Sequence, residues 1–102
     1  MNDITVEELK KRMDAGEQLH VIDVREPYEY DEFNIGARLI PLGELPSQLD
    51  DLASFKNEEI IVHCRSGARS NTAKQFMVEN GFTNVRNLLG GMLDWQSKFG
   101  NA

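Results

Sequence analysis

Cys64 is the only cysteine of this chain, and it lies between a short apolar segment and a basic turn. The turn carries Arg65 and Arg69, which place two permanent positive charges close to the sulfur in an otherwise acidic sequence. A free cysteine titrates near ~8.5, and neighbouring cations or a helix N-terminus lower that pKa. The pattern therefore indicates a thiolate nucleophile at Cys64.

The elements on either side of Cys64 must position it. Residues 60–63 (Ile-Ile-Val-His) are typical of a buried parallel strand, and a helix is expected to open at Arg69 or Ser70 and to close at Gly81. A tight turn between them can direct successive backbone N–H groups inward, and the helix N-terminus adds further donors. The sequence thus predicts a loop that binds an anionic substrate, formed by Arg65, Ser66, Gly67, Ala68 and Arg69.

Strand-like and helix-like segments alternate along the rest of the chain. Helices are predicted over residues 5–15, 27–33 and 43–55 and after Gly90-Gly91, and strands over residues 19–24, 38–40 and 85–88. This alternation predicts an α/β fold with a mostly parallel sheet, and residues 1–102 are expected to form one domain. Ligands of such sheets bind at the carboxyl ends of the strands, which is where Cys64 is expected.

Composition and charge exclude several classes of function. A net charge of −6 over 102 residues argues against non-specific binding to nucleic acid. No apolar run approaches the roughly 20 residues that span a bilayer, and the polar, acidic N-terminal segment does not have the form of a signal peptide, so we expect a cytoplasmic protein. One cysteine excludes an internal disulfide and metal sites built on several thiolates. Any second thiol must come from another molecule.

The order of these motifs resembles the rhodanese (thiosulfate sulfurtransferase) family over nearly the whole chain. The matching segments are residues 21–27 with 29–30, residues 40–45, residues 64–70, and residues 89–91 with Trp95. One segment departs from the family pattern. Residues 33–37 (Phe-Asn-Ile-Gly-Ala) lack the histidine of the usual Gly-His-Ile-Pro-Gly-Ala and look one residue shorter, and we expect them to shape a connection rather than to do chemistry.

The resemblance implies a fold and an activity. It implies a five-stranded, mostly parallel sheet flanked by helices on both faces, with no metal and no organic cofactor. Cys64 would be the catalytic nucleophile that forms a persulfide, and the loop from Arg65 to Arg69 would bind the substrate. The expected partners are a small anionic sulfur donor, such as thiosulfate or a persulfide, and an external thiol, cyanide or protein acceptor. We expect a monomer that binds neither nucleic acid nor membrane.

Two alternatives remain open at this point. A cysteine phosphatase or arsenate reductase also has a His-Cys pair and an arginine-ended loop, but the phosphatase pattern places the arginine six residues after the cysteine. That position is Ser70 here, and arsenate reductases need further thiols that this chain lacks. A non-catalytic binding module is the second alternative, and an intact Cys64 with both arginines argues against it.

Several other polar or large residues are expected to be structural. Asp23 and Arg25 should form an ion pair or a cap, and His20 should be a packed or edge histidine. Strand alternation points His63 away from Cys64, so we do not expect it to act as the general base. Four residues at helical spacing are predicted to be core: Phe76, Met77, Met92 and Trp95.

Overall fold

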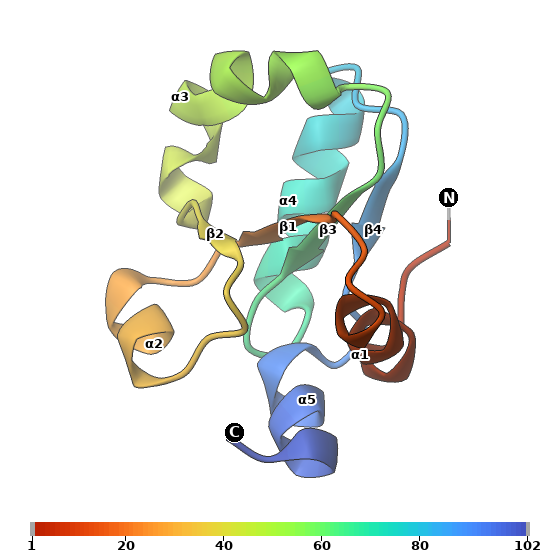
Figure 1. Ribbon diagram of the computed structural model, residues 1–102. Coiled ribbons are helices and arrows are strands. Elements are labelled where there is room, and N and C mark those ends of the chain that lie inside the picture. The colour runs from red at the N-terminus through yellow and green to blue at the C-terminus, as the bar shows by residue number, and fades with distance from the viewer. Residues whose placement is uncertain (1, 102) are drawn as a thin grey trace.

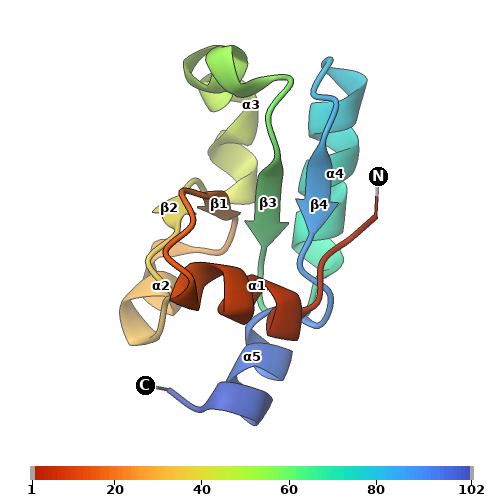
Figure 2. The ribbon, with the colours of Figure 1, turned by 45° about the vertical axis from the view of Figure 1, so that its right-hand side comes forward.

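A parallel β-sheet forms the centre of the protein in the computed structural model, which describes residues 2–101 (Figure 1). Its strands are β1 (His20–Asp23), β2 (Arg38–Leu39), β3 (Ile60–His63) and β4 (Val85–Asn87). Their order across the sheet is β2-β1-β3-β4, and every pair is parallel. Strand β3 therefore lies inside the sheet, and the arrows of β3 and β4 point the same way in Figure 2.

Helices cover both faces of this sheet. They are α1 (Val6–Asp14), α2 (Pro27–Glu32), α3 (Leu45–Gln48), α4 (Ala68–Glu79) and α5 (Gly91–Phe99), with 3-10 turns at Leu42–Glu44 and Leu49–Phe55. Residues of α3 and α4 pack into one hydrophobic core, and residues of α1 and α5 pack into the other. None of the helices within residues 2–101 is long and apolar enough to cross a membrane. The α/β fold with helices on both faces is confirmed.

Within residues 2–101 the sheet has four strands, so the expectation of five was wrong in number. Where a fifth strand would lie beside β4, there is one isolated parallel bridge between Ile4 and Leu88. The backbone N–H of Ile4 donates to the Asn87 carbonyl at 3.0 Å, but pairing stops there because Thr5 already caps α1. The Thr5 side chain accepts a hydrogen bond from the Glu8 N–H, so the chain turns into a helix after a single residue of pairing.

The predicted helix over residues 43–55 is broken into three short pieces. Its central α-helical turn is α3, and 3-10 geometry precedes and follows it. Pro46 has no N–H to donate to the carbonyl of Leu42, and the Ser47 hydroxyl donates to the Glu44 carbonyl at 2.8 Å instead. Leu45 and Leu52 are still buried, as their spacing predicted.

Alternation along β3 decides which side chain faces which core. Ile60, Val62 and Cys64 belong to the core under α3 and α4, whereas Ile61 belongs to the core under α1 and α5. All four residues of β3 are buried. Three of the predicted core residues, Met77, Met92 and Trp95, are also buried, and Phe76 packs partly buried against the first core. Cys64 therefore emerges from the sheet on the side of α4.

Candidate active site

The loop between β3 and α4 wraps around the Cys64 sulfur. Gly67 is the N-cap of α4 and has a φ of 106°, a left-handed conformation that a side chain would strain. This conformation lets the Gly67 N–H donate to Cys64 Sγ at 3.1 Å. The helix begins at Ala68, slightly earlier than predicted, so its first turn lies directly beside the sulfur.

Ser70 supplies the other donors to the sulfur. Its backbone N–H lies 3.4 Å from Cys64 Sγ, and its hydroxyl oxygen lies 3.3 Å away. Burial raises the pKa of the Cys64 thiol, but hydrogen bonds from the Ser70 hydroxyl, the Ser70 and Gly67 N–H groups and the Ser66 N–H together bring the pKa below its ordinary value. The loop thus stabilises negative charge on the sulfur of a buried cysteine.

Asn87 ties the loop to the end of β4, a role that the sequence analysis missed. Its Oδ1 lies 2.6 Å from the Ser70 hydroxyl oxygen and shares the single hydroxyl proton with the more distant Cys64 sulfur, and its Nδ2 donates to the Gly67 carbonyl at 3.1 Å. The Asn87 side chain is buried. The available signal was a polar residue near the carboxyl end of the strand predicted over residues 85–88, at the same edge of the sheet as Cys64.

The two loop arginines have different surroundings. Arg69 donates twice to Glu29 of α2, with Nη1–Oε1 at 2.7 Å and Nη2–Oε2 at 2.9 Å. These hydrogen bonds lower the pKa of Glu29 to about 2, against an opposing effect of burial. Arg65 is exposed and has no hydrogen-bond or ion-pair partner among residues 2–101. Sequence reasoning placed both arginines on the loop but missed Glu29, which is 40 residues from Arg69 along the chain.

The outer side of the loop is held by the start of α5. The Met92 N–H donates to the Cys64 carbonyl at 3.0 Å, and the Leu93 N–H donates to the Arg65 carbonyl at 2.9 Å. Gly91 makes this approach possible because a Cβ there would lie 2.5 Å from the Cys64 carbonyl oxygen. Ser66 and Ala68 are exposed on the loop surface. A depression of about 520 Å³ is lined by Arg65 together with Tyr28, Glu32 and Gln96.

Asp23 and Arg25 form the structural ion pair that the sequence predicted. Both residues are buried, Arg25 Nη2 lies 2.8 Å from Asp23 Oδ2, and the same Nη2 donates to the Phe33 carbonyl at 2.7 Å. The pair therefore fastens the start of α2 and the segment after it. Within residues 2–101, no group of three or more His, Cys, Asp or Glu side chains is arranged to hold a metal ion.

Within residues 2–101, neither histidine is hydrogen-bonded to the Cys64 sulfur. The ring of His63 is fully buried, its Nε2 lies 3.8 Å from Asp23 Oδ2, and neither ring nitrogen has a hydrogen-bond partner among residues 2–101. Burial lowers the pKa of His63 to about 4, so the ring is neutral at pH 7. His20 lies 3.0 Å from a Glu58 oxygen and packs on Phe55, as expected for an edge histidine.

The segment that departs from the family pattern, residues 33–37, is held by hydrogen bonds to its own residues and to Tyr30. Asn34 Nδ2 donates to the Tyr30 carbonyl at 3.0 Å, and Asn34 Oδ1 accepts from the Gly36 N–H at 2.9 Å. The Tyr30 hydroxyl donates to the Ala37 carbonyl at 3.0 Å. These bonds shape the connection from α2 to β2.

Comparison with known proteins agrees with this geometry. Residues 5–98 match the family described as "Rhodanese-like domain". The chain is 40% identical over 97 residues to YrkF of Bacillus subtilis, a protein named as a candidate sulfur carrier, and this match covers 94% of the chain and 51% of YrkF. It is 38% identical over 76 residues to "Thiosulfate sulfurtransferase PspE" of Escherichia coli, covering 74% of the chain and 72% of PspE. The chain thus spans about half the length of the first relative and most of the second.

A solved structure has the same fold. The crystal structure of a rhodanese-like domain protein from Staphylococcus aureus superimposes with a TM-score of 0.80 at 35% sequence identity. The superposition covers 93% of this chain and 91% of that one.

Proposed function

The chain belongs to the rhodanese-like family, and from this membership we propose that it is a sulfurtransferase in which Cys64 carries one sulfane sulfur as a persulfide. The observation that carries the proposal is the convergence of the Gly67 N–H and the Ser70 N–H on the sulfur of one buried cysteine, with the Ser70 hydroxyl oxygen 3.3 Å from the same sulfur. Such donors stabilise a thiolate and equally a persulfide anion. Similarity to a named thiosulfate sulfurtransferase supports the same chemistry.

In the first half-reaction, the Cys64 thiolate attacks the outer sulfur of a donor such as thiosulfate. A sulfur–sulfur bond forms at Cys64, the sulfur–sulfur bond of the donor breaks, and sulfite leaves with the electron pair. A thiolate and a dianion about 4 Å apart repel each other by about 8 kcal/mol at an effective dielectric near 20. The loop amides and arginine charge must offset that repulsion.

The loop residues divide this task in the proposal. Arg65, Ser66, Gly67, Ala68 and Arg69 together form the donor-binding loop. The backbone N–H groups stabilise the sulfur. Arg65 supplies a positive charge at the surface that is not paired with a carboxylate of residues 2–101, and Arg69 links the loop to α2 through its ion pair with Glu29.

In the second half-reaction, the outer sulfur passes to an external acceptor. The sequence contains no second cysteine to resolve the persulfide, so the acceptor is a small thiol, cyanide or a protein. A reducing compartment keeps the lone thiol available, which supports a cytoplasmic setting. We also propose that the protein is a monomer.

Intact-mass measurement tests this function. We expect the wild-type protein exposed to thiosulfate or to a small persulfide to gain the mass of one sulfur atom and to lose it on addition of cyanide. Cys64→Ser is the control, and it should gain nothing, because the hydroxyl is a far weaker nucleophile. Sulfur transfer that persists in Cys64→Ser would contradict the mechanism.

The phosphatase alternative is tested on the same two proteins. The loop places Arg69 five residues after Cys64, and a phosphatase would need the arginine at the position of Ser70. We expect negligible hydrolysis of an aryl phosphate by the wild-type protein. Robust phosphate release that disappears in Cys64→Ser would replace sulfur transfer with phosphatase chemistry.

A further inference from the structure

We propose that Glu29 determines the charge that the loop presents to a sulfur donor, and that it makes the site favour singly charged sulfane donors over doubly charged ones. The inference rests on the proposed sulfur transfer and deepens it, since it concerns the class of donor. The observation behind it is an ion pair between a loop arginine and a residue outside the loop. Glu29 forms an ion pair with Arg69, one of the two loop arginines, so this guanidinium is not available to pair with an anionic donor.

The pair between Glu29 and Arg69 joins two helices, α2 and α4. Both guanidinium–carboxylate contacts are short, 2.7 Å and 2.9 Å, and the Glu29 side chain is 12% exposed. Glu29 Oε1 also accepts a hydrogen bond from the Glu26 N–H at 3.1 Å, as part of the capping box of α2. The carboxylate is therefore fixed by the first turn of α2, and Arg69 is fixed by the first turn of α4. Neither partner is free to turn toward a donor without breaking these bonds.

The charge near the loop is consequently smaller than its sequence suggests. A bidentate guanidinium–carboxylate pair has no net charge, so an approaching anion meets a dipole there and not a full positive charge. Arg65 is the loop guanidinium without an acidic partner among residues 2–101. The neighbouring helix α2 adds further exposed carboxylates at Asp31 and Glu32. The loop thus offers about one effective positive charge in acidic surroundings.

Donor charge determines how much this matters. Coulomb energy is proportional to the charge of the donor, so withdrawal of one positive charge weakens the binding of a dianion twice as much, in free energy, as that of a monoanion. Thiosulfate carries two charges, whereas an alkyl persulfide or an alkyl thiosulfonate carries one. The geometry therefore points to a singly charged sulfane donor.

Two probes isolate donor charge. Thiosulfate transfers its outer sulfur to the Cys64 thiolate and releases sulfite, which takes the electron pair of the broken bond. Methanethiosulfonate transfers its outer sulfur in the same way and releases methanesulfinate. Both reactions leave the same Cys64 persulfide and need no other oxidant or reductant. The donors thus differ by one charge while the product on the protein is the same.

The central variant is Glu29→Gln, which keeps the size of the side chain and an acceptor for the Glu26 N–H but removes the charge. We expect KM to fall by about tenfold for thiosulfate and by about threefold for methanethiosulfonate, the square root of the first factor, with kcat changed little. Asp31→Asn is the matched control. It removes one charge from the same helix at a residue that neither pairs with Arg69 nor lines the depression beside Arg65, and screening should keep its effect below about twofold for both donors.

The double variant Glu29→Gln/Arg69→Gln restores the net charge of the wild-type site. The measured quantity is kcat/KM for thiosulfate divided by kcat/KM for methanethiosulfonate. If the wild-type pair acts as a neutral unit, this ratio in the double variant returns to within about twofold of the wild-type ratio. If Arg69 already gives its full charge to the donor in the wild-type protein, Glu29→Gln leaves the ratio unchanged and the double variant reduces it, which would overturn the inference. The double variant alone decides the matter if the single variant does not fold.

Failure of this inference is distinguishable from failure of the proposed function. Wild-type protein that forms no persulfide with either donor would reject sulfur transfer and, with it, this inference. If both donors load the wild-type protein but the kcat/KM ratio of the two donors is the same in Glu29→Gln as in wild type, the role of Glu29 is rejected and sulfur transfer is not.

Discussion

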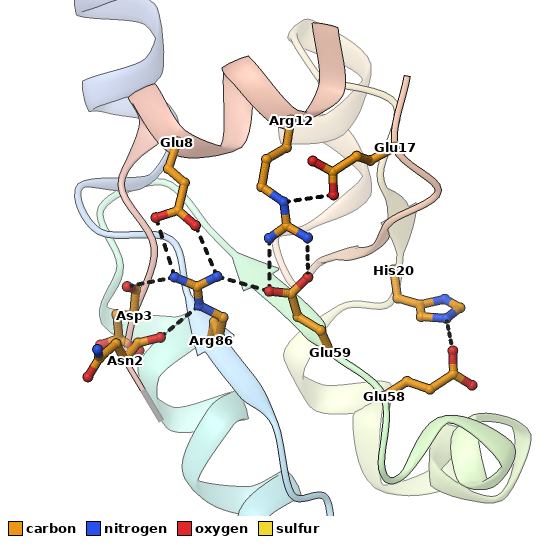
Figure 3. Close-up of polar contacts among 9 residues, drawn as sticks. All are labelled: Asn2, Asp3, Glu8, Arg12, Glu17, His20, Glu58, Glu59 and Arg86. Carbon is orange, nitrogen blue, oxygen red and sulfur yellow. Dashed lines mark hydrogen bonds and ion pairs between the residues drawn. The ribbon is translucent and has the colours of Figure 1, made fainter. Parts of the chain in front are cut away.

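At the amino end of β3 the Glu59 carboxylate lies between two guanidinium groups, whereas at the carboxyl end of the same strand all donors to the Cys64 sulfur within residues 2–101 are uncharged. Arg12 Nη2 and Arg86 Nη1 lie 2.6 Å and 2.9 Å from the two Glu59 oxygens (Figure 3). The donors to the sulfur are the N–H groups of the loop and the Ser70 hydroxyl, 3.1–3.4 Å away.

The charge at the amino end is compensated by groups from several elements. Arg86 of β4 also reaches Glu8 of α1, and Arg12 of α1 also reaches Glu17 (Figure 3). Hydrogen bonds from Arg12 and Arg86 lower the pKa of Glu59 to about 2 although burial opposes this, the bond from Arg12 having the largest effect. The network joins α1 to the sheet.

The difference between the two ends separates stability from function. A compensated charge network has its partners within the fold and stabilises it. At the carboxyl end, the loop donors surround the Cys64 sulfur, and Arg65 beside it has no partner in the described chain. Changes at the amino end should therefore alter the free energy of unfolding, and changes at the carboxyl end should alter the reactivity of the sulfur.

Gly91→Ala should have the largest effect, and it should alter both properties because Gly91 supports the loop from outside. A Cβ at Gly91 would lie 2.5 Å from the Cys64 carbonyl oxygen and 2.6 Å from the Arg65 carbonyl oxygen, at a φ of 54°. We expect a loss of about 2–4 kcal/mol in the free energy of unfolding and a slower rate of persulfide formation. Urea unfolding and the loading rate measure the two effects.

Gly43→Ala is the control for that variant. No atom lies within 4 Å of the position that a Cβ at Gly43 would take, and we expect a change within about 0.5 kcal/mol. Equal stability of the two alanine variants would show that α5 does not support the loop through this close contact.

Glu59→Gln should destabilise the protein by about 1–2 kcal/mol at pH 7 without altering the reactivity of Cys64, since it weakens only the compensated end. Glu59 has a folded pKa of about 2 against an ordinary value of 4.5, so its contribution is complete above about pH 4.5 and is lost as the pH falls toward 2. The gap between variant and wild type should narrow over that interval. Urea unfolding at pH 7 and at pH 3 measures it.

Asp14→Asn is the matched control for Glu59→Gln. It removes a carboxylate from the exposed pair with Lys10, which should contribute less than about 0.5 kcal/mol. A Glu59→Gln variant as stable as Asp14→Asn, or one with a shifted alkylation midpoint of Cys64, would remove the contrast between the two ends of β3.

Ser70→Ala should act at the Cys64 sulfur and also at the loop, because it removes the hydroxyl that donates to the buried Asn87 Oδ1. Loss of the hydroxyl donor should raise the pKa of Cys64 from its lowered value, so less thiolate is present at pH 7 and alkylation there slows several-fold. The pH dependence of the reaction with iodoacetamide measures the midpoint, and Ser70→Thr, which keeps the hydroxyl, should restore it. An unshifted midpoint in Ser70→Ala would assign the thiolate to the backbone donors alone.

Local patterns in the sequence were sufficient for much of the fold. The β-branched residues of 60–63 and the capping pattern at Thr5 predicted β3 and α1 because hydrophobic periodicity and caps act within a few residues. Position after a parallel strand was enough to place Cys64 at the edge where such sheets bind ligands.

Sequence alone therefore predicted the position of Cys64 after β3, the turn that follows it and the α/β alternation of this protein, since each depends on neighbours along the chain. Only the tertiary structure decided that Glu29 neutralises Arg69, that Asn87 holds Ser70, and that pairing next to β4 stops at one bridge. Each of these depends on the distance between elements far apart in sequence, which packing sets and residue order does not.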